Sequence, residues 1–249
     1  MKNILLTIEY DGTDFAGWQR QTRQRSVQGE VERGLSLLFQ KPVEVFAASR
    51  TDAGVHAYGQ KANFITEQDI PVENIRKALN GMLPADIRII RAEEVPMDFH
   101  ARFSAKGKKY VYKLFLAEER RVFDRNYAYT VTRRLNVEAM KEAASYFLGT
   151  HDFKPFSGNN GQPRPNTIRT IEAIEILAGP ENTFHIEVTG NAFLYKMVRM
   201  MTGSLLSIGY GKYPPQIIME ILEGKRKRIG NTAKPQGLYL VEVYYNREK

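Results

Sequence analysis

The sequence contains no cysteine in its 249 residues. This absence excludes disulfide bonds, thiolate zinc sites and cysteine nucleophiles. Histidine is also scarce, and no two of the four histidines lie three to five residues apart. Since histidine ligands of a metal often occur at such spacings, a metal site has no local support. We interpret these four residues as core or surface side chains: His56, His100, His151 and His185.

Long apolar runs are missing as well. No segment approaches the roughly 20 apolar residues that a membrane-spanning helix needs. The apolar run after Met1 is short and is interrupted by Glu9, which is unlike a signal peptide. With 43% hydrophobic residues the chain can still build a packed core. We therefore expect a soluble, cytoplasmic protein that does not bind a membrane.

The common cofactor motifs are absent too. The chain has no G-x-x-x-x-G-K-[ST] loop, no G-x-G-x-x-G after a strand and no G-x-S-x-G elbow. Chemistry on nucleoside triphosphates or dinucleotides, and serine hydrolase chemistry, are therefore not indicated. We expect no cofactor, which leaves carboxylates, tyrosines and arginines as the reactive groups.

Basic residues are abundant. The net charge is +8, from 36 Lys and Arg against 28 Asp and Glu, and such a charge favours a polyanionic partner. Several basic clusters adjoin aromatic residues, a mixture suited to phosphate contacts and base stacking. We interpret them as binding nucleic acid in preference to forming a solvated surface. The clusters are Arg20, Arg23 and Arg25; Lys106, Lys108 and Lys109; Arg120, Arg121 and Arg125; and the run at 225–228.

Periodicity in the first part of the chain predicts alternating strands and helices. Ser26 is a suitable N-cap for a helix with apolar residues at helical spacing, and Pro71 suits the start of a second helix. The predicted order is β-α-β-β-α-β, a ferredoxin-like unit. Its elements are a strand at 4–10, a helix at 27–38, strands at 43–48 and 61–65, a helix at 71–82 and a strand at 87–90.

The same order of elements recurs in the second part. We therefore predict an α+β fold of two ferredoxin-like (RNA-recognition-motif-like) halves, 1–105 and 106–249. Their antiparallel-rich sheets either join into a continuous sheet with a central catalytic cleft or remain in independent domains. Polar loops at 19–28 and 154–167 are either functional or disordered. The elements of the second half are strands at 110–116, 171–177, 184–189 and 238–244, and helices at 137–148 and 193–208.

One acidic turn carries the most information about chemistry. In the segment 49–57, S-R-T-D-A-G-V-H-A, Asp52 follows a predicted strand, and Arg50 stands two residues before it. A carboxylate at a strand end has a rigid base and room for a ligand. The alternative is that Thr51 and Asp52 only form the turn, since both readily hydrogen-bond their own backbone.

Two further residues have both a structural and a functional interpretation. Tyr110 is either a good strand former or a ring that stacks on a base, with neighbouring lysines holding phosphates. Arg199 lies on the polar side of its predicted helix with the small residues Gly203 and Ser207. That side is either solvated or closely approached. In the second case, Arg199 can pair with a carboxylate and lower its pKa.

The segment R-T-D-A-G-V-H-A at 50–57 resembles the signature of the TruA family of tRNA pseudouridine synthases. Ser49 departs from the family pattern, which has glycine there. Lys234 and Pro235 replace a small-residue segment, and neither departure affects Asp52. The resemblance extends over the whole chain through the segments 10–19, 99–104, 109–112, 151–153, 193–194, 198–199 and 237–238.

The resemblance implies a cofactor-independent isomerase that converts uridine to pseudouridine at positions 38, 39 and 40 of the tRNA anticodon arm. It also implies a homodimer that binds tRNA across both subunits. Asp52 becomes the catalytic acid, Tyr110 stacks on the target base, and Arg199 pairs with Asp52. Arg50 is expected to open the stem or to fill the space left by the flipped base.

The reaction breaks the bond from ribose C1′ to base N1 and joins C1′ to C5, so one carboxylate suffices. Asp52 can attack C1′, attack the base or remove a ribose proton, and the sequence does not choose among these routes. Two rival functions stay open from the residues alone. One is a non-catalytic RNA-binding module, and the other is a glycosylase that releases uracil.

Overall fold

The computed structural model describes residues 1–119, 122–159, 161 and 166–246. It divides into two compact units, Met1–Lys106 with Tyr239–Lys249, and Gly107–Leu238. Each unit has a mixed α+β fold with mostly antiparallel strands. Arg120 and Arg121 of the predicted basic clusters lie outside the described residues, as does part of the predicted loop at 154–167.

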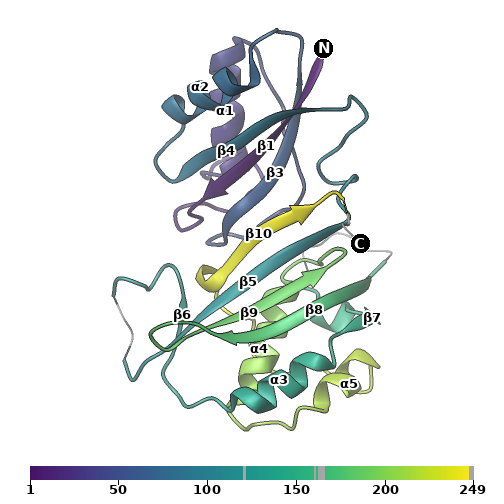
Figure 1. Cartoon of the computed structure of the whole chain (residues 1–249). Helices are drawn as coiled ribbons and strands as arrows, with labels where there is room; N and C mark the ends of the chain where they lie inside the picture. Colours follow the sequence, from purple (N-terminus) through teal and green to yellow (C-terminus); the bar gives the residue numbers. More distant parts are fainter. Residues whose placement is uncertain (120–121, 160, 162–165, 247–249) are drawn as a thin grey trace. The chain divides into compact units, whose positions relative to one another are not determined.

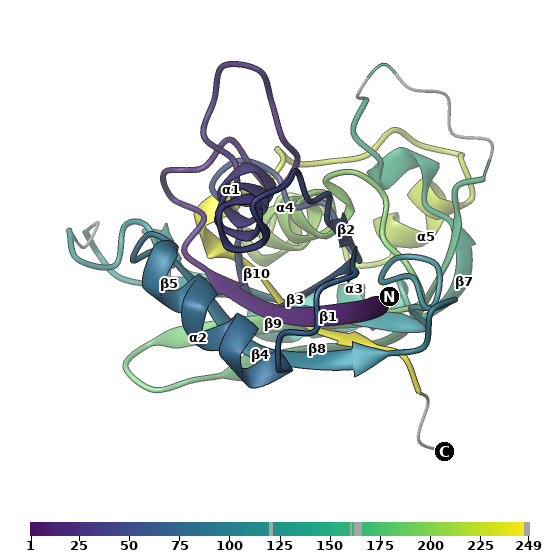
Figure 2. The ribbon, with the colours of Figure 1, turned by 90° about the horizontal axis from the view of Figure 1, so that it is seen from above.

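In the first unit the order of elements follows the sequence prediction (Figure 1). The sheet order is β4-β1-β3, and β2 and β10 pair with the other edge of β3. Helix α1 lies over the face formed by β1 and β3 (Figure 2). The elements are β1 (Lys2–Tyr10), α1 (Val27–Phe39), β2 (Phe46–Ala47), β3 (His56–Thr66), α2 (Val72–Met82), β4 (Ile87–Val95) and β10 (Leu238–Tyr244).

The predicted helix start at Ser26 is confirmed, because the Ser26 side chain accepts a hydrogen bond from the Gly29 N–H. Of the four apolar residues of α1 that the helical spacing singles out, Val27, Val31 and Leu35 are fully buried, and Leu38 is half-buried. These side chains contribute to the core with the alternating apolar residues of β1, Ile4, Leu6 and Ile8.

The strand predicted at 43–48 is wrong in extent, because β2 has two residues only. Upstream of β2, helix α1 satisfies the backbone in place of a neighbouring strand. The Val45 N–H donates to Glu32 Oε1 at 3.2 Å, and the Val43 N–H donates to Ser36 Oγ, also at 3.2 Å. Backbone donors that are satisfied by side chains have no need of a ladder partner.

The last strand requires a second correction. The predicted half at 106–249 includes it, but the structure assigns the chain from Tyr239 onward to the first unit. β10 pairs in parallel with β3, where Tyr239 lies opposite His56 and Leu240 lies opposite Ala57. This pairing joins residues about 180 positions apart, a separation that local periodicity does not detect.

The second unit contains the sheet β5-β9-β8-β7, and β6 pairs in parallel with β5 (Figure 1). The short elements β6, β7 and α5 were not predicted, because they span too few residues to show a period. The elements are β5 (Gly107–Leu116), β6 (Tyr129–Val131), α3 (Val137–Ser145), β7 (Gly149–Asp152), η1 (Lys154–Phe156), β8 (Ile168–Ala178), β9 (Thr183–Gly190), α4 (Met197–Gly209), α5 (Ile217–Leu222) and η2 (Pro235–Gly237).

Both predicted helices of this unit are shorter than expected. α4 begins at Met197 and not at 193, because Lys196 adopts the left-handed φ of 60° and interrupts any earlier helical turn. α3 ends at Ser145, and the predicted extension to 148 consists of turns that lead to Gly149 at φ 93°.

Candidate active site

Asp52 lies on a turn immediately before β3, and its side chain is half-buried. The turn is tied to an earlier segment by an isolated antiparallel bridge between Asp52 and Gly17. The Trp18 N–H donates to the Thr51 carbonyl at 3.1 Å, and the Val55 N–H donates to the Asp52 carbonyl at 3.1 Å. The backbone that carries the carboxylate is therefore fixed from two sides.

Two glycines permit this close approach. Gly17 has φ 103°, and a Cβ at this position would lie 2.6 Å from the Thr51 carbonyl oxygen. A Cβ at Gly12 would lie 2.0 Å from the Val55 carbonyl oxygen. Backbone therefore packs directly on backbone on either side of Asp52, and any side chain at these two positions would displace the turn.

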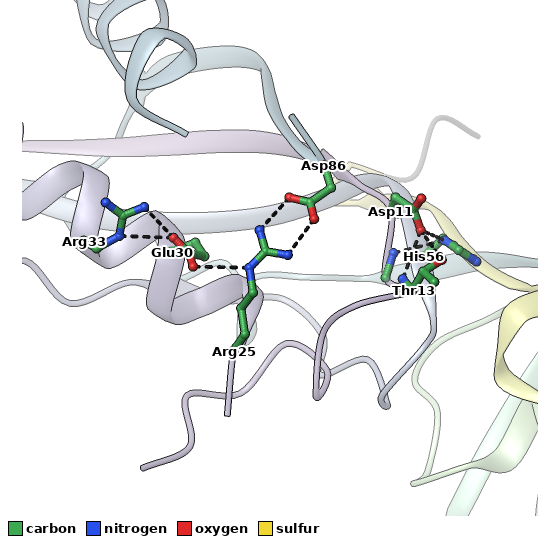
Figure 3. A network of polar contacts seen from close by, with 8 residues as sticks. Asp11, Thr13, Arg25, Glu30, Arg33, His56 and Asp86 are labelled. Atoms are coloured by element: carbon green, nitrogen blue, oxygen red, sulfur yellow. Dashed lines mark hydrogen bonds and ion pairs between the residues drawn. The ribbon is translucent and has the colours of Figure 1, made fainter. Parts of the chain in front are cut away.

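Buried polar groups support the turn from below. The Tyr10 hydroxyl and Thr51 Oγ1 lie 2.8 Å apart and form a buried hydrogen bond. His56 Nδ1 accepts from the Gly12 N–H at 3.0 Å and lies 3.1 Å from Asp11 Oδ1 (Figure 3). His56, interpreted from the sequence as a core or surface side chain, is buried, and no role was predicted for Tyr10. The available signal was that these two residues lie in the segments 50–57 and 10–19, which carry the family resemblance.

A second polar network holds the loop that leads into α1. Arg25 donates to both carboxylate oxygens of Asp86, at 2.6 and 2.8 Å, and its guanidinium lies 4.1 Å from the centre of the Phe15 ring. Glu30 bridges Arg25 and Arg33 (Figure 3). The hydrogen bonds to Asp86 are the main cause that raises the pKa of Arg25. This network fixes the chain next to Gly17.

The cluster Arg20, Arg23 and Arg25 is therefore only partly available to a polyanion. Arg20 pairs with the buried Glu32 at 2.9 Å, and Arg25 pairs with Asp86. Arg23 is exposed and has no ion pair within the described residues. Arg50 is likewise exposed and has no hydrogen-bond or ion-pair partner in the part of the chain that the structure describes.

Tyr110 lies on β5 of the second unit, opposite Val188 of β9. It is buried, and its ring meets the Phe193 ring edge-on at 5.0 Å between centroids. Tyr112, two residues further, donates its hydroxyl to the Lys234 carbonyl at 2.7 Å. Burial raises the pKa of Tyr112. Tyr112 therefore anchors the chain at Lys234, and Tyr110 is held by a neighbouring ring.

Arg199 is the one half-buried residue of an otherwise buried stretch of α4. Its Nε donates to the Ala233 carbonyl at 2.8 Å, and the Ala233 N–H donates to the Arg199 carbonyl at 3.0 Å. A Cβ at Gly203 would lie 1.7 Å from the Asn231 carbonyl oxygen. The polar side of this helix is thus closely approached by the segment 229–233, and the alternative of a solvated face is wrong.

The four predicted site residues lie in different units. Asp52 and Arg50 belong to the first, and Tyr110 and Arg199 belong to the second. The pairing of Arg199 with Asp52 and the stacking role of Tyr110 therefore stay predictions. Across the described ranges, no group of three or more His, Asp or Glu side chains is arranged to hold a metal ion. None of the described helices is both long and apolar enough to cross a membrane.

Comparison with known proteins identifies the family. A family model described as tRNA pseudouridine synthase matches residues 6–104 and 143–246. The tRNA pseudouridine synthase A of Acetivibrio thermocellus is 47% identical over 246 residues, which is 98% of this chain and 100% of the relative. The enzyme of the same name from Ruminiclostridium cellulolyticum is also 47% identical, and tRNA pseudouridine synthase A 2 of Clostridium perfringens is 46% identical, both with the same coverage.

Solved structures contribute less. The archaeal box H/ACA sRNP Nop10-Cbf5 complex aligns with 95% of this chain at 10% identity, and the chain covers 46% of that chain. The TM-score is 0.34, too low to support an argument. The matching family model and the relatives aligned over their full length show that the chain belongs to the tRNA pseudouridine synthase family, whose isomerases convert uridine to pseudouridine in tRNA.

Proposed function

We propose that Asp52 supplies the catalytic carboxylate of this tRNA isomerase. The observation that carries the proposal is its placement: a half-buried acid on a turn whose backbone is bridged to Gly17 and hydrogen-bonded through Thr51 and Val55. A carboxylate held in this way needs little reorganisation when it meets the reacting uridine. The matched family segment at 6–104 contains the whole turn.

The other site residues have supporting roles in the proposal. Tyr110, whose ring is backed by Phe193, stacks on the target base and keeps the detached uracil in place. Arg199 pairs with the Asp52 carboxylate. Arg50, exposed beside the turn, opens the stem or occupies the space that the flipped base leaves.

The substrate uridines are proposed to be those at positions 38, 39 and 40 of the anticodon arm, and the active form a homodimer that binds tRNA across both subunits. We also propose that each unit is a ferredoxin-like half and that the enzyme acts in the cytoplasm, where its tRNA substrate is found. In the first unit, the strand order β4-β1-β3-β2 with two intervening helices supports such a half.

The decisive experiment compares Asp52→Asn with Asp14→Asn, a matched control in an exposed turn nearby. Asp52→Asn is expected to lower pseudouridine formation by about a thousandfold or more and to leave tRNA affinity unchanged. Asp14→Asn is expected to behave as wild type. Turnover retained in Asp52→Asn would refute the assignment.

The products are mapped on unmodified tRNA by carbodiimide-blocked reverse transcription without added cofactor. Stops at positions 38–40 support the proposed specificity, and stops elsewhere in the tRNA contradict it. Family membership argues against the two rival functions, which this assay also separates: a binding module produces no stops, and a glycosylase leaves abasic sites. Arg199→Met is expected to reduce turnover far more than thermal stability.

A further inference from the structure

An exposed aromatic patch in the first unit is formed by the loop between β4 and β5 together with Phe46 of β2. Phe103 is 74% exposed and Phe46 is 38% exposed. The His100 ring lies between them, with its centroid 4.4 Å from that of Phe103 and 5.4 Å from that of Phe46. Three tilted rings thus form a continuous aromatic surface, whose exposure to water is unfavourable in free energy.

The loop that presents His100 and Phe103 is held in place by hydrogen bonds. The Ala101 N–H donates to Asn63 Oδ1 at 2.9 Å, and the Tyr245 hydroxyl donates to the Ala101 carbonyl at 3.0 Å. Asn3 Nδ2 donates to the Phe99 carbonyl at 2.8 Å. Ala101 and Asn63 are buried. Phe103 is therefore held out by fixed backbone, which lowers the entropic cost of binding a partner.

A cation completes the patch. The Arg102 guanidinium lies 5.6 Å from the centre of the Phe103 ring and has no carboxylate partner among the described residues. The Arg102 backbone N–H donates to His100 Nδ1 at 3.1 Å and so ties these two residues together. Aromatic faces next to an unpaired guanidinium are typical of surfaces that stack nucleic acid bases and contact phosphates.

We propose that Phe103, His100, Phe46 and Arg102 form a tRNA contact separate from the reacting uridine, with Phe103 stacking on an unpaired base and Arg102 contacting a phosphate. Phe46 pairs with Asn63, seven residues along β3 from His56, which is about 23 Å at the usual rise of a strand. The proposal assigns the patch to tRNA binding and not to the chemical step at Asp52.

The proposal rests on the tRNA substrate of the proposed function but not on the role of Asp52. RNA is favoured over a protein partner because the guanidinium is unneutralised and the chain carries a net charge of +8. The nucleotide that stacks is identified only by its chemistry, an unpaired base with an adjacent phosphate.

The test measures the Kd for unmodified tRNA and the single-turnover rate at saturating tRNA. Phe103→Ala is expected to raise the Kd for tRNA by about tenfold, and Phe103→Trp is expected to have a Kd close to that of the wild type. Both variants should keep the wild-type single-turnover rate at saturating tRNA. Arg102→Gln is expected to raise Kd and to reduce the salt slope by about one. Leu37→Ala is the control, since Leu37 is an apolar side chain of α1 with 58% exposure, and it should change neither quantity.

A Kd for Phe103→Ala within twofold of the wild-type value would overturn the proposal. So would a lower saturating rate with unchanged Kd, which would place the residue in catalysis. Loss of self-association with intact tRNA affinity would assign the patch to a protein contact and would also overturn it. Failure of the Asp52 assignment has a different signature, turnover in Asp52→Asn, so the two proposals fail independently.

Discussion

Replacing Gly17 by alanine tests whether the Asp52 turn is built by direct backbone packing. The φ of 103° at Gly17 is unfavourable for alanine by about 1–2 kcal/mol. The new Cβ would meet the Thr51 carbonyl oxygen at 2.6 Å and the Ala53 nitrogen at 3.1 Å. Such overpacking costs about 1–3 kcal/mol more. The summed loss of about 2–5 kcal/mol corresponds to a melting temperature lower by about 5–15 °C.

The clash also has a catalytic consequence, because the atoms that the new Cβ displaces flank Asp52. We expect single-turnover pseudouridine formation in Gly17→Ala to fall by about a hundredfold, the loss expected from a displacement of about 1 Å. Thermal unfolding and the turnover assay are measured on the same preparation.

Gly224→Ala isolates the backbone effect, since Gly224 has φ 73° and a Cβ added there would have no atom within 4 Å. This control should lose only the conformational component, about 1–2 kcal/mol, and should retain full activity. Equal melting temperatures for the two variants, with full activity in Gly17→Ala, would refute the reasoning.

Three further experiments test the remaining structure. Tyr112→Phe should cost about 1–2 kcal/mol through its lost hydrogen bond. Burial raises the pKa of Tyr112, so its contribution to the free energy of unfolding is fully present below about pH 10 and is lost as pH rises further. The melting temperature of Tyr112→Phe should therefore fall less at alkaline pH than that of the wild type. The same dependence of melting temperature on pH in both proteins would contradict this. Arg25→Met should lower the melting temperature more than Arg33→Met, since Arg25 pairs with Asp86 and Glu30, whereas Arg33 pairs with Glu30 alone among the described residues. Equal losses would show that the Asp86 pair is unimportant. Lys227→Gln should reduce the salt dependence of tRNA binding. Arg228→Gln should mainly lower the melting temperature, because Arg228 donates to the carbonyls of Ile229 and Gly230. A stability loss in Lys227→Gln together with a weaker salt dependence in Arg228→Gln would contradict these two roles.

The elements that the sequence predicted correctly are those with a strong local signal. Ser26 with its following apolar spacing located α1, and the alternation from Ile4 onward located β1. The errors arise where hydrogen bonds to residues of other elements determine the local backbone structure. Val43 and Val45 look like strand residues, yet helix side chains take their N–H groups. The pairing of Tyr239 with the start of β3 likewise has no local signature.

The candidate site shows the same division. Neighbouring residues correctly predicted a turn at Asp52, but this turn lies immediately before β3 and not at the end of a strand at 43–48, because β2 ends at Ala47. The small residue Gly203 correctly indicated a close approach to α4. The groups that hold the turn could not be found in this way. The Tyr10 hydroxyl reaches Thr51 across 41 residues, and Gly17 reaches Asp52 across 35. Such contacts depend on the folded topology and on no local pattern.

The basic clusters show why net charge alone is a poor guide to the RNA-binding surface. Arg20 and Arg25 are paired with Glu32 and Asp86 and thereby hold the loop beside Gly17. The carboxylates of Glu32 and Asp86 neutralise most of the positive charge of these two arginines, so we expect them to add little to tRNA affinity directly. Arg102 belongs to none of the clusters, has no carboxylate partner among the described residues, and lies 5.6 Å from the centre of an exposed ring. We therefore expect tRNA to contact Arg102 and its neighbouring rings in preference to the paired arginines Arg20 and Arg25.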